Sequence, residues 1–100
     1  MAVLVIGEFR LPAESLAAAQ EPMARVIAAT RAEAGCLLYA YSQDITEPGL
    51  FRISERWESR AALDAHFATP HMATWQQERE ALGLHGRRIS IVEIAAEEIL

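Results

Sequence analysis

Apolar and polar residues alternate along positions 50–57, and this alternation is typical of a β-strand with one buried face. Ile53 and Trp57 fall on the inward face, and Arg52 falls on the outward face. Glu55 also falls on the inward face, although a carboxylate is costly to bury without a partner. We therefore expect Glu55 to be protonated, or to be paired with a histidine or arginine from elsewhere in the chain.

Three further stretches have strand patterns. Residues 36–44 alternate in the same way, and the turn sequence Thr-Glu-Pro-Gly at 46–49 predicts that they form an antiparallel hairpin with residues 50–57. Residues 2–10 and 87–95 instead carry apolar side chains at both odd and even positions. Strands of that kind are covered on both faces, so we expect neither face of these two segments to be open to water.

Helical spacing of apolar residues predicts helices between the strands. The first spans residues 13–34, in which Pro22 should kink or interrupt the helix, and Gly35 should end it. The second begins at Ser59, whose hydroxyl can cap the first turn, and ends near Thr69. A third runs from about residue 71 to 82, and one of its faces carries Met72, Trp75, Arg79 and Leu82.

The predicted order of elements is β-α-β-β-α-β within one domain that spans residues 1–100. With right-handed crossovers, this order gives the ferredoxin-like α+β sandwich, a four-stranded antiparallel sheet with helices on one face. The first and last strands are apolar on both faces, so the face that lacks helices should pack against a second copy. We predict a homodimer joined through its sheets, an assembly of the dimeric α/β-barrel type.

Composition narrows the class of protein. Hydrophobic residues make up 52% of the chain and charged residues 23%, as in a globular domain. The formal net charge is −5 and the nine basic residues are scattered arginines, which argues against nucleic acid as a partner. The single cysteine, Cys36, has no partner for an intramolecular disulfide. Because no apolar run reaches the length of a membrane span and the first residues do not resemble a signal peptide, we expect a cytoplasmic protein without membrane contact.

His66 is the main candidate for catalysis. It falls within the apolar stripe of the second helix, beside Leu63 and Phe67. A neutral imidazole in such a place can act as a general base, because its ordinary pKa lies near neutrality and burial lowers it. A lone inward histidine is more often structural, with both nitrogens bonded. If Glu55 pairs with His66, the carboxylate would orient the ring as it does in a catalytic dyad.

Other inward residues could bind a ligand. An apolar pocket able to stack a ring could be lined by Trp57, Phe67, Met72 and Trp75, although each of these is equally typical of a core. Tyr39 and Tyr41 could add hydroxyls, although paired strand tyrosines are common without function, and His71 could form a contact at the rim. We expect no metal site, because His66 and His71 are five residues apart rather than four, and Cys36 lies in no metal-binding motif.

Three segments together resemble the antibiotic biosynthesis monooxygenase domain. They are GCLLYAYSQD at 35–44, FRISERWES at 51–59 and AALDAHFATPHMATW at 61–75. The resemblance implies a dimeric ferredoxin-like fold with a pocket between the sheet and the helices. It also implies a possible activity, since members of this family include oxygenases that convert hydroquinones or polyketide phenols to quinones without metal or flavin.

Carried onto this chain, the resemblance implies roles for particular residues. His66 would be the base or anion stabiliser, Glu55 its orienting partner, and His71 a residue near the pocket mouth, while the ring-binding wall would comprise Trp57, Phe67 and Trp75. Haem-degrading relatives have tryptophan in place of His66 and a histidine ligand about ten residues later, where this chain has Gln76. Haem degradation is therefore not expected.

The leading hypothesis is a cofactor-independent monooxygenase that oxidises a hydroquinone or a polyketide-type phenol with dioxygen in an apolar pocket. One alternative is a non-catalytic small-molecule-binding or accessory protein with the same pocket. Another is an acid–base isomerase that uses His66 to shift a proton on an enolisable substrate. The fold-level resemblance alone does not choose between these reactions.

Overall fold

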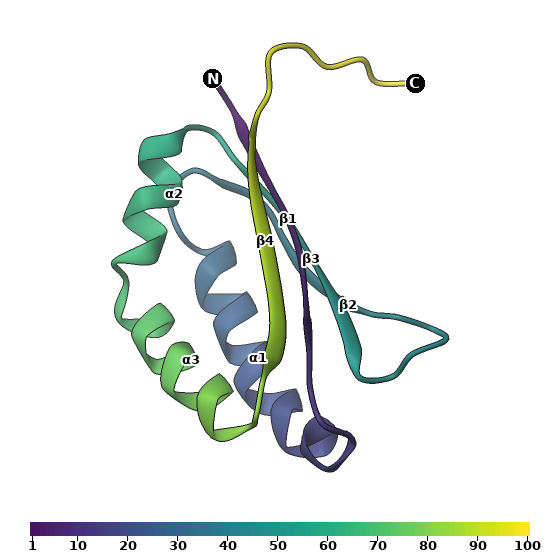
Figure 1. Cartoon of the computed structure of the whole chain (residues 1–100). Coiled ribbons are helices and arrows are strands. Elements are labelled where there is room, and N and C mark those ends of the chain that lie inside the picture. The colour runs from purple at the N-terminus through teal and green to yellow at the C-terminus, as the bar shows by residue number, and fades with distance from the viewer.

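The computed structural model describes residues 1–100 and contains four strands and four helical segments. The strands lie in one sheet, and the helices cover one of its faces (Figure 1). No helix is both long enough and apolar enough to cross a membrane. In chain order the elements are β1 (Val3–Arg10), the 3-10 turn η1 (Ala13–Ser15), α1 (Leu16–Arg31), β2 (Cys36–Gln43), β3 (Leu50–Trp57), α2 (Arg60–Phe67), α3 (Pro70–Ala81) and β4 (His85–Glu93).

The sheet has the strand order β2-β3-β1-β4, and every neighbouring pair is antiparallel. This arrangement confirms the predicted ferredoxin-like α+β fold. The register places Glu55 of β3 between Tyr39 of β2 and Val5 of β1, with Ile91 of β4 opposite Val5. Residues that are directly opposite share a face, so Glu55 and Tyr39 point toward the helices together.

Local signals in the sequence account for the helix boundaries. The Ser59 side chain accepts a hydrogen bond from the backbone N–H of Ala62 at 3.1 Å, which caps α2 as predicted. Helix α1 continues through Pro22 without interruption. Gly35, with a φ of 82°, reverses the chain after α1, where a residue with a side chain would be strained. These turns bring α1, α2 and α3 onto the same face of the sheet.

The two faces of the sheet differ in burial. On the helix side, Val5, Tyr39 and Trp57 are almost completely buried. On the other side, Ile6 and Val92 are 57% and 43% exposed. The prediction that the last strand is covered on both faces is wrong for the single chain, because β4 lies at the edge of the sheet and most of it is exposed.

Candidate functional site

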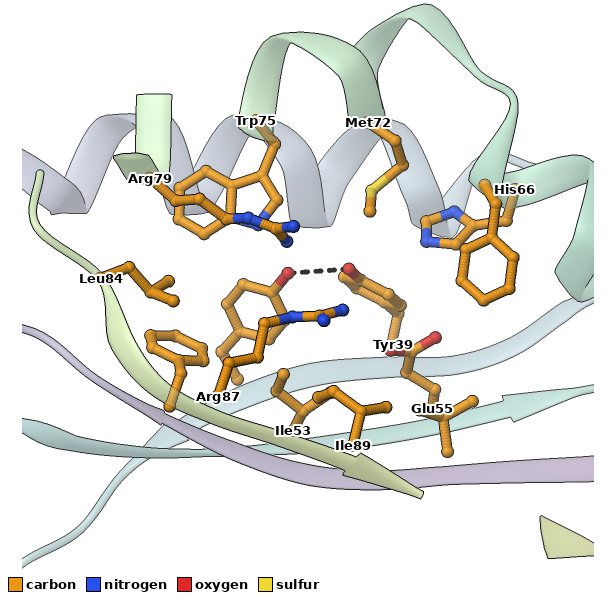
Figure 2. A pocket seen from close by; sticks show the side chains of 14 residues that line it. Tyr39, Ile53, Glu55, His66, Met72, Trp75, Arg79, Leu84, Arg87 and Ile89 are labelled. Carbon is orange, nitrogen blue, oxygen red and sulfur yellow. Dashed lines mark hydrogen bonds between the residues drawn. The ribbon is translucent and has the colours of Figure 1, made fainter. Parts of the chain in front are cut away.

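A small cavity lies between the sheet and helices α2 and α3 (Figure 2). Its free space is about 30 Å³, enough for one or two water molecules. An aromatic ring can therefore enter only if side chains of the wall move. The lining combines an apolar majority with six polar or ionisable side chains; it consists of Val5, Phe9, Tyr39, Tyr41, Ile53, Glu55, His66, Phe67, Met72, Trp75, Arg79, Leu84, Arg87 and Ile89.

His66 reaches this cavity from α2 and is 1% exposed. Its Nδ1 lies 2.7 Å from Oε2 of Glu33. Because the carboxylate oxygen accepts, the proton of the neutral ring belongs on Nδ1, and Nε2 keeps its lone pair. Figure 2 shows the ring at one end of the cavity, with this second nitrogen directed inward. Burial lowers the pKa of His66, and the neighbouring Glu33 carboxylate partly offsets the effect.

Glu33 is the functional residue that the sequence analysis missed. It lies just after α1, and its Oε2 accepts hydrogen bonds from His66 Nδ1 and from His71 Nε2, both at 2.7 Å. The residues that it joins are 33 and 38 positions away along the chain, so no local pattern pairs them. One signal in the sequence could have identified Glu33. The C-terminal end of a helix carries a partial negative charge, so an acidic residue just beyond it is repelled unless a hydrogen-bond donor or a cation from elsewhere compensates.

Glu55 points toward the helices as predicted and is 8% exposed, but it does not pair with His66 or with an arginine. Its Oε1 accepts a hydrogen bond from Trp57 Nε1 at 2.9 Å. Residues two apart in a strand share a face, which places the indole N–H within reach of the carboxyl group. Burial raises the pKa of Glu55 to about 7, although the Trp57 bond and the charge of Arg87 lower it. Glu55 and His66 line the same cavity as separate groups.

The predicted ligand-binding residues divide into two groups. Cavity-lining residues are Tyr39, Phe67, Met72 and Trp75. Trp57 and His71 are not part of the lining. Trp57 is completely buried at the end of β3, beneath the His66 ring, with a distance of 4.8 Å between ring centroids. His71 lies in the first turn of α3 on the side that faces α1, where it bonds Glu33 away from the cavity.

Two tyrosines and two arginines form the other end of the cavity. The hydroxyl groups of Tyr39 and Tyr41 are 2.8 Å apart, and the guanidinium groups of Arg79 and Arg87 lie beside them (Figure 2). Burial raises the pKa of both phenols, that of Tyr41 to about 12. Both therefore remain protonated donors near neutral pH. The sequence analysis offered both tyrosines as possible pocket hydroxyls, but it did not include either arginine among the site residues.

Glu33, His66 and His71 also offer one ligand atom each within 4.8 Å of one another. Two histidines and a carboxylate form a donor set that zinc and iron use. The prediction of no metal considered only the spacing of the histidines and overlooked Glu33. In this structure, each ring directs a nitrogen at the carboxylate oxygen from 2.7 Å, a hydrogen-bond distance. An ion would have to displace both of these protons.

The comparisons with known proteins agree on one family. The model of the antibiotic biosynthesis monooxygenase family matches residues 2–78. An uncharacterised protein of Synechocystis sp. is 37% identical over 71 residues, which are 71% of this chain and 48% of that protein. The chain thus spans about half the length of this curated relative.

Solved structures give the same result over nearly the whole chain. A Deinococcus radiodurans protein, provisionally described as an antibiotic biosynthesis monooxygenase, is 30% identical with a TM-score of 0.91, and the match covers 98% of this chain and 97% of that one. The protein PA3566 from Pseudomonas aeruginosa is 30% identical with a TM-score of 0.84, and the match covers 95% of each chain.

Proposed function

Because this chain belongs to the antibiotic biosynthesis monooxygenase family, we propose that it is a cofactor-independent monooxygenase that oxidises a hydroquinone or a polyketide-type phenol with dioxygen. The observation that carries the proposal is the state of His66. Its Nδ1 is bonded to Glu33, and its Nε2 faces a cavity walled by aromatic and apolar side chains. This is the arrangement that a general base for a phenolic proton requires.

In the proposed reaction, the substrate hydroxyl donates its proton to Nε2 of His66. The imidazolium that results is stabilised at Nδ1 by the Glu33 carboxylate, which His71 holds in place through a second hydrogen bond. Burial keeps the pKa of His66 low, so the ring is neutral and ready to accept a proton at pH 7. The carboxylate that orients the base is thus Glu33, in the role that the sequence assigned to Glu55.

The substrate anion is electron-rich and can pass electrons to dioxygen without a metal or flavin. A carbon–oxygen bond then forms at an activated ring carbon, the imidazolium of His66 returns its proton to the resulting peroxide, and cleavage of the O–O bond with loss of water leaves a carbonyl or hydroxyl group. An anthrone supplies four electrons when its CH₂ becomes C=O, and a hydroquinone supplies four when it becomes a hydroxyquinone. Four electrons reduce one dioxygen to the inserted oxygen atom and one water, so no external reductant is required.

Entry of a ring requires the solvent-side wall to move, because the cavity holds only about 30 Å³ of free space. Phe67 is 47% exposed, Arg87 is exposed and Arg79 is half-buried. These three side chains lie between the cavity and solvent, and their displacement costs less than rearrangement of the core. We propose that movement of Phe67 opens the entrance while Arg79 and Arg87 stay beside the cavity, and that Met72 and Trp75 contact the ring once it is inside.

The proposal also includes a homodimer joined through the sheet face that lacks helices. Apolar side chains on this face are exposed in the single chain, among them Ile6, Leu38 and Val92. Exposed apolar side chains on one face of a small domain are characteristic of a protein interface. Analytical ultracentrifugation should give the mass of two chains, and Ile6→Arg should shift the protein toward the monomer. A wild-type monomer at micromolar concentration would contradict this part of the proposal.

The function itself is tested by oxygen uptake with anthrone or a reduced naphthoquinone, corrected for the reaction without protein. We expect the wild type to consume oxygen and His66→Ala to lose this activity. His85→Ala is the matched control, because His85 is an exposed histidine that is not part of the cavity lining. Equal rates in the wild type and His66→Ala would refute the proposed role of His66 for these substrates.

A second candidate is ligand binding without turnover, and one observation favours it. The cavity is small, and His66 already has a carboxylate partner, as expected for a structural histidine. Under this alternative, the same ring compounds quench the fluorescence of Trp75 but cause no oxygen uptake beyond the reaction without protein.

A further inference from the structure

Two guanidinium groups from different elements enter the same cavity. Arg79 comes from α3 and Arg87 from β4, and Figure 2 shows both side chains directed toward the dashed hydrogen bond that the Tyr39 hydroxyl forms; its partner is the hydroxyl of Tyr41. A guanidinium carries a full positive charge under all ordinary conditions. The end of the cavity opposite His66 therefore holds two positive charges and two neutral hydroxyl donors.

Neither of these guanidinium groups has a carboxylate within 4 Å. The contrast with the rest of the chain is clear, because most other arginines have an acidic partner; those in ion pairs are Arg10, Arg25, Arg52, Arg56 and Arg60. The arginines without an ion pair also include Arg31, which donates to the carbonyl of Tyr39, and Arg88, which is exposed. Arg79 and Arg87 are thus the unpaired arginines that line the cavity.

This arrangement is unfavourable in the absence of a ligand. Burial lowers the pKa of Arg79, and the charge of Arg87 lowers it further. Both causes mean that the charged form is poorly solvated and is repelled by a neighbour of the same sign. The one acid that lines the cavity, Glu55, is bonded to Trp57 Nε1 and does not form an ion pair with either arginine. An anionic ligand would supply the missing counter-charge.

We propose that Arg79 and Arg87 form an anion-binding subsite, and that the substrate is an aromatic acid with a phenolic hydroxyl at one end and a carboxylate at the other. The carboxylate would lie between the guanidinium groups, which present planar donors that match its two oxygens. One of the Tyr39 and Tyr41 hydroxyls donates to the other, and the second can donate its proton to the same carboxylate. This assignment of the substrate class rests on the proposed function, since it places the phenol at His66.

Two ligands with the same ring, one with a carboxylate and one without, test whether the negative charge is recognised. 6-Hydroxy-2-naphthoic acid carries the hydroxyl and carboxylate at opposite ends of a flat ring, and its methyl ester has the same ring without the charge. In isothermal titration calorimetry at pH 6, where Glu55 with its pKa of about 7 is mainly protonated, we expect the acid to bind roughly tenfold to a hundredfold more tightly than the ester, as charged hydrogen bonds would provide. Equal affinity for the two compounds would overturn the proposal.

Substitutions of the two arginines test whether they cause the preference for the acid over the ester. Arg79→Gln and Arg87→Gln should each reduce the affinity for the acid by about tenfold or more and leave that for the ester nearly unchanged. Arg79→Lys should retain part of the preference, because it keeps the charge but loses the planar donors. Arg60→Gln is the matched control, since Arg60 pairs with Asp64 on the exposed side of α2. A preference that survives in the folded Arg79→Gln/Arg87→Gln double variant would also overturn the proposal.

The His66→Ala variant separates this inference from the proposed function. It should lose oxygen uptake and keep the preference for the acid over the ester, because the two ends of the cavity act independently. If the wild type prefers the acid but consumes no oxygen with anthrone or the reduced naphthoquinone, the subsite stands and the monooxygenase does not. If oxygen uptake is found without a preference for the acid, the monooxygenase proposal stands and the anion-binding subsite does not.

Discussion

The charged groups at one end of the cavity have partners, and those at the other end do not. At the histidine end, Glu33 accepts hydrogen bonds from both His66 and His71, so the carboxylate and the two ring nitrogens that face it have partners. At the arginine end, the guanidinium groups of Arg79 and Arg87 have no carboxylate within 4 Å. Both ends line or support one cavity between the sheet and the helices.

The difference indicates that the two ends of the cavity have different roles. A paired cluster fixes the orientation of its side chains before a ligand arrives, which is what a base needs in order to meet a proton at a defined position. An unpaired charge keeps its capacity to interact until a ligand of opposite sign arrives. The histidine end is therefore suited to chemistry, and the arginine end to binding.

The largest effect is expected at the histidine end. His66→Gln removes the base but keeps a polar side chain of similar length, so the corrected rate of oxygen uptake should fall about 10²- to 10⁴-fold. Binding of an aromatic acid should change much less, because it depends on the arginine end. A similar loss in both measurements would show that the two ends do not act separately.

Glu55 lies in the cavity between the two ends and affects stability. Folding raises its pKa from 4.5 to about 7, so between these values the folded state holds a proton that the unfolded chain has lost. The stability associated with that proton is full below pH 4.5 and is lost as the pH rises through 7. Glu55→Gln should therefore raise the free energy of unfolding, relative to wild type, by up to about 3 kcal/mol more at pH 8 than at pH 4.5.

The measurement for Glu55 is urea denaturation of both proteins at each pH. The other ionisable groups are identical in the two proteins, so their contributions largely cancel in the difference. A difference that does not change with pH would mean that folding leaves the pKa of Glu55 unshifted, so that Glu55 is ionised in the folded state near neutral pH. The two arginines would then have a counter-ion, and the contrast between the two ends would be weaker.

Glu33→Gln tests whether the orienting carboxylate is needed. The amide is neutral, so we expect oxygen uptake to fall roughly 10- to 100-fold, the value of a charged hydrogen bond. Because Glu33 raises the pKa of His66, its removal should also move the acid limb of the pH–rate profile to lower pH. Glu80→Gln, a change on the exposed side of α3, should leave the profile in place. An unshifted profile in Glu33→Gln would argue against the pairing.

His71→Ala should have the smallest effect. It removes one of the two hydrogen bonds to Glu33 and leaves the bond to His66 intact. We expect a loss of about 1 kcal/mol in the free energy of unfolding and only a severalfold change in rate. A loss of activity as large as that of His66→Gln would assign His71 a direct role and extend the histidine end beyond His66.

The sequence predicted the fold well because the signals are local. Alternation of apolar residues located β3, and Ser59 capped α2. Gly35 has the positive φ expected of a glycine after a helix, but α1 ends at Arg31, before the predicted residue 34. The inward placement of His66 and Glu55 followed from the same periodicities. The wrong coverage of β4 came from treating an apolar strand as central, because periodicity does not reveal which strand lies at the edge of the sheet.

The partners of the site residues could not be predicted in the same way. Glu33 reaches His66 across 33 residues, and only the three-dimensional turn after α1 brings them together. Glu55 was expected to pair with a base or a cation, whereas the neutral indole of Trp57 on the same strand face is closer. Arg79 was placed on the face of α3 that contains Met72 and Trp75, but the pattern did not show that a second arginine would approach it from β4.

The most direct test of the central claim is the protonation state of His66, which can be read from a long-range ¹H–¹⁵N NMR spectrum of the labelled wild-type protein at pH 7. We predict a neutral ring with its proton on Nδ1, bonded to Glu33, and an unprotonated Nε2. His66→Gln and His85→Ala identify the signals by their disappearance. An imidazolium, or a neutral ring with its proton on Nε2, would contradict the account, because the nitrogen that faces the cavity could not then accept a proton.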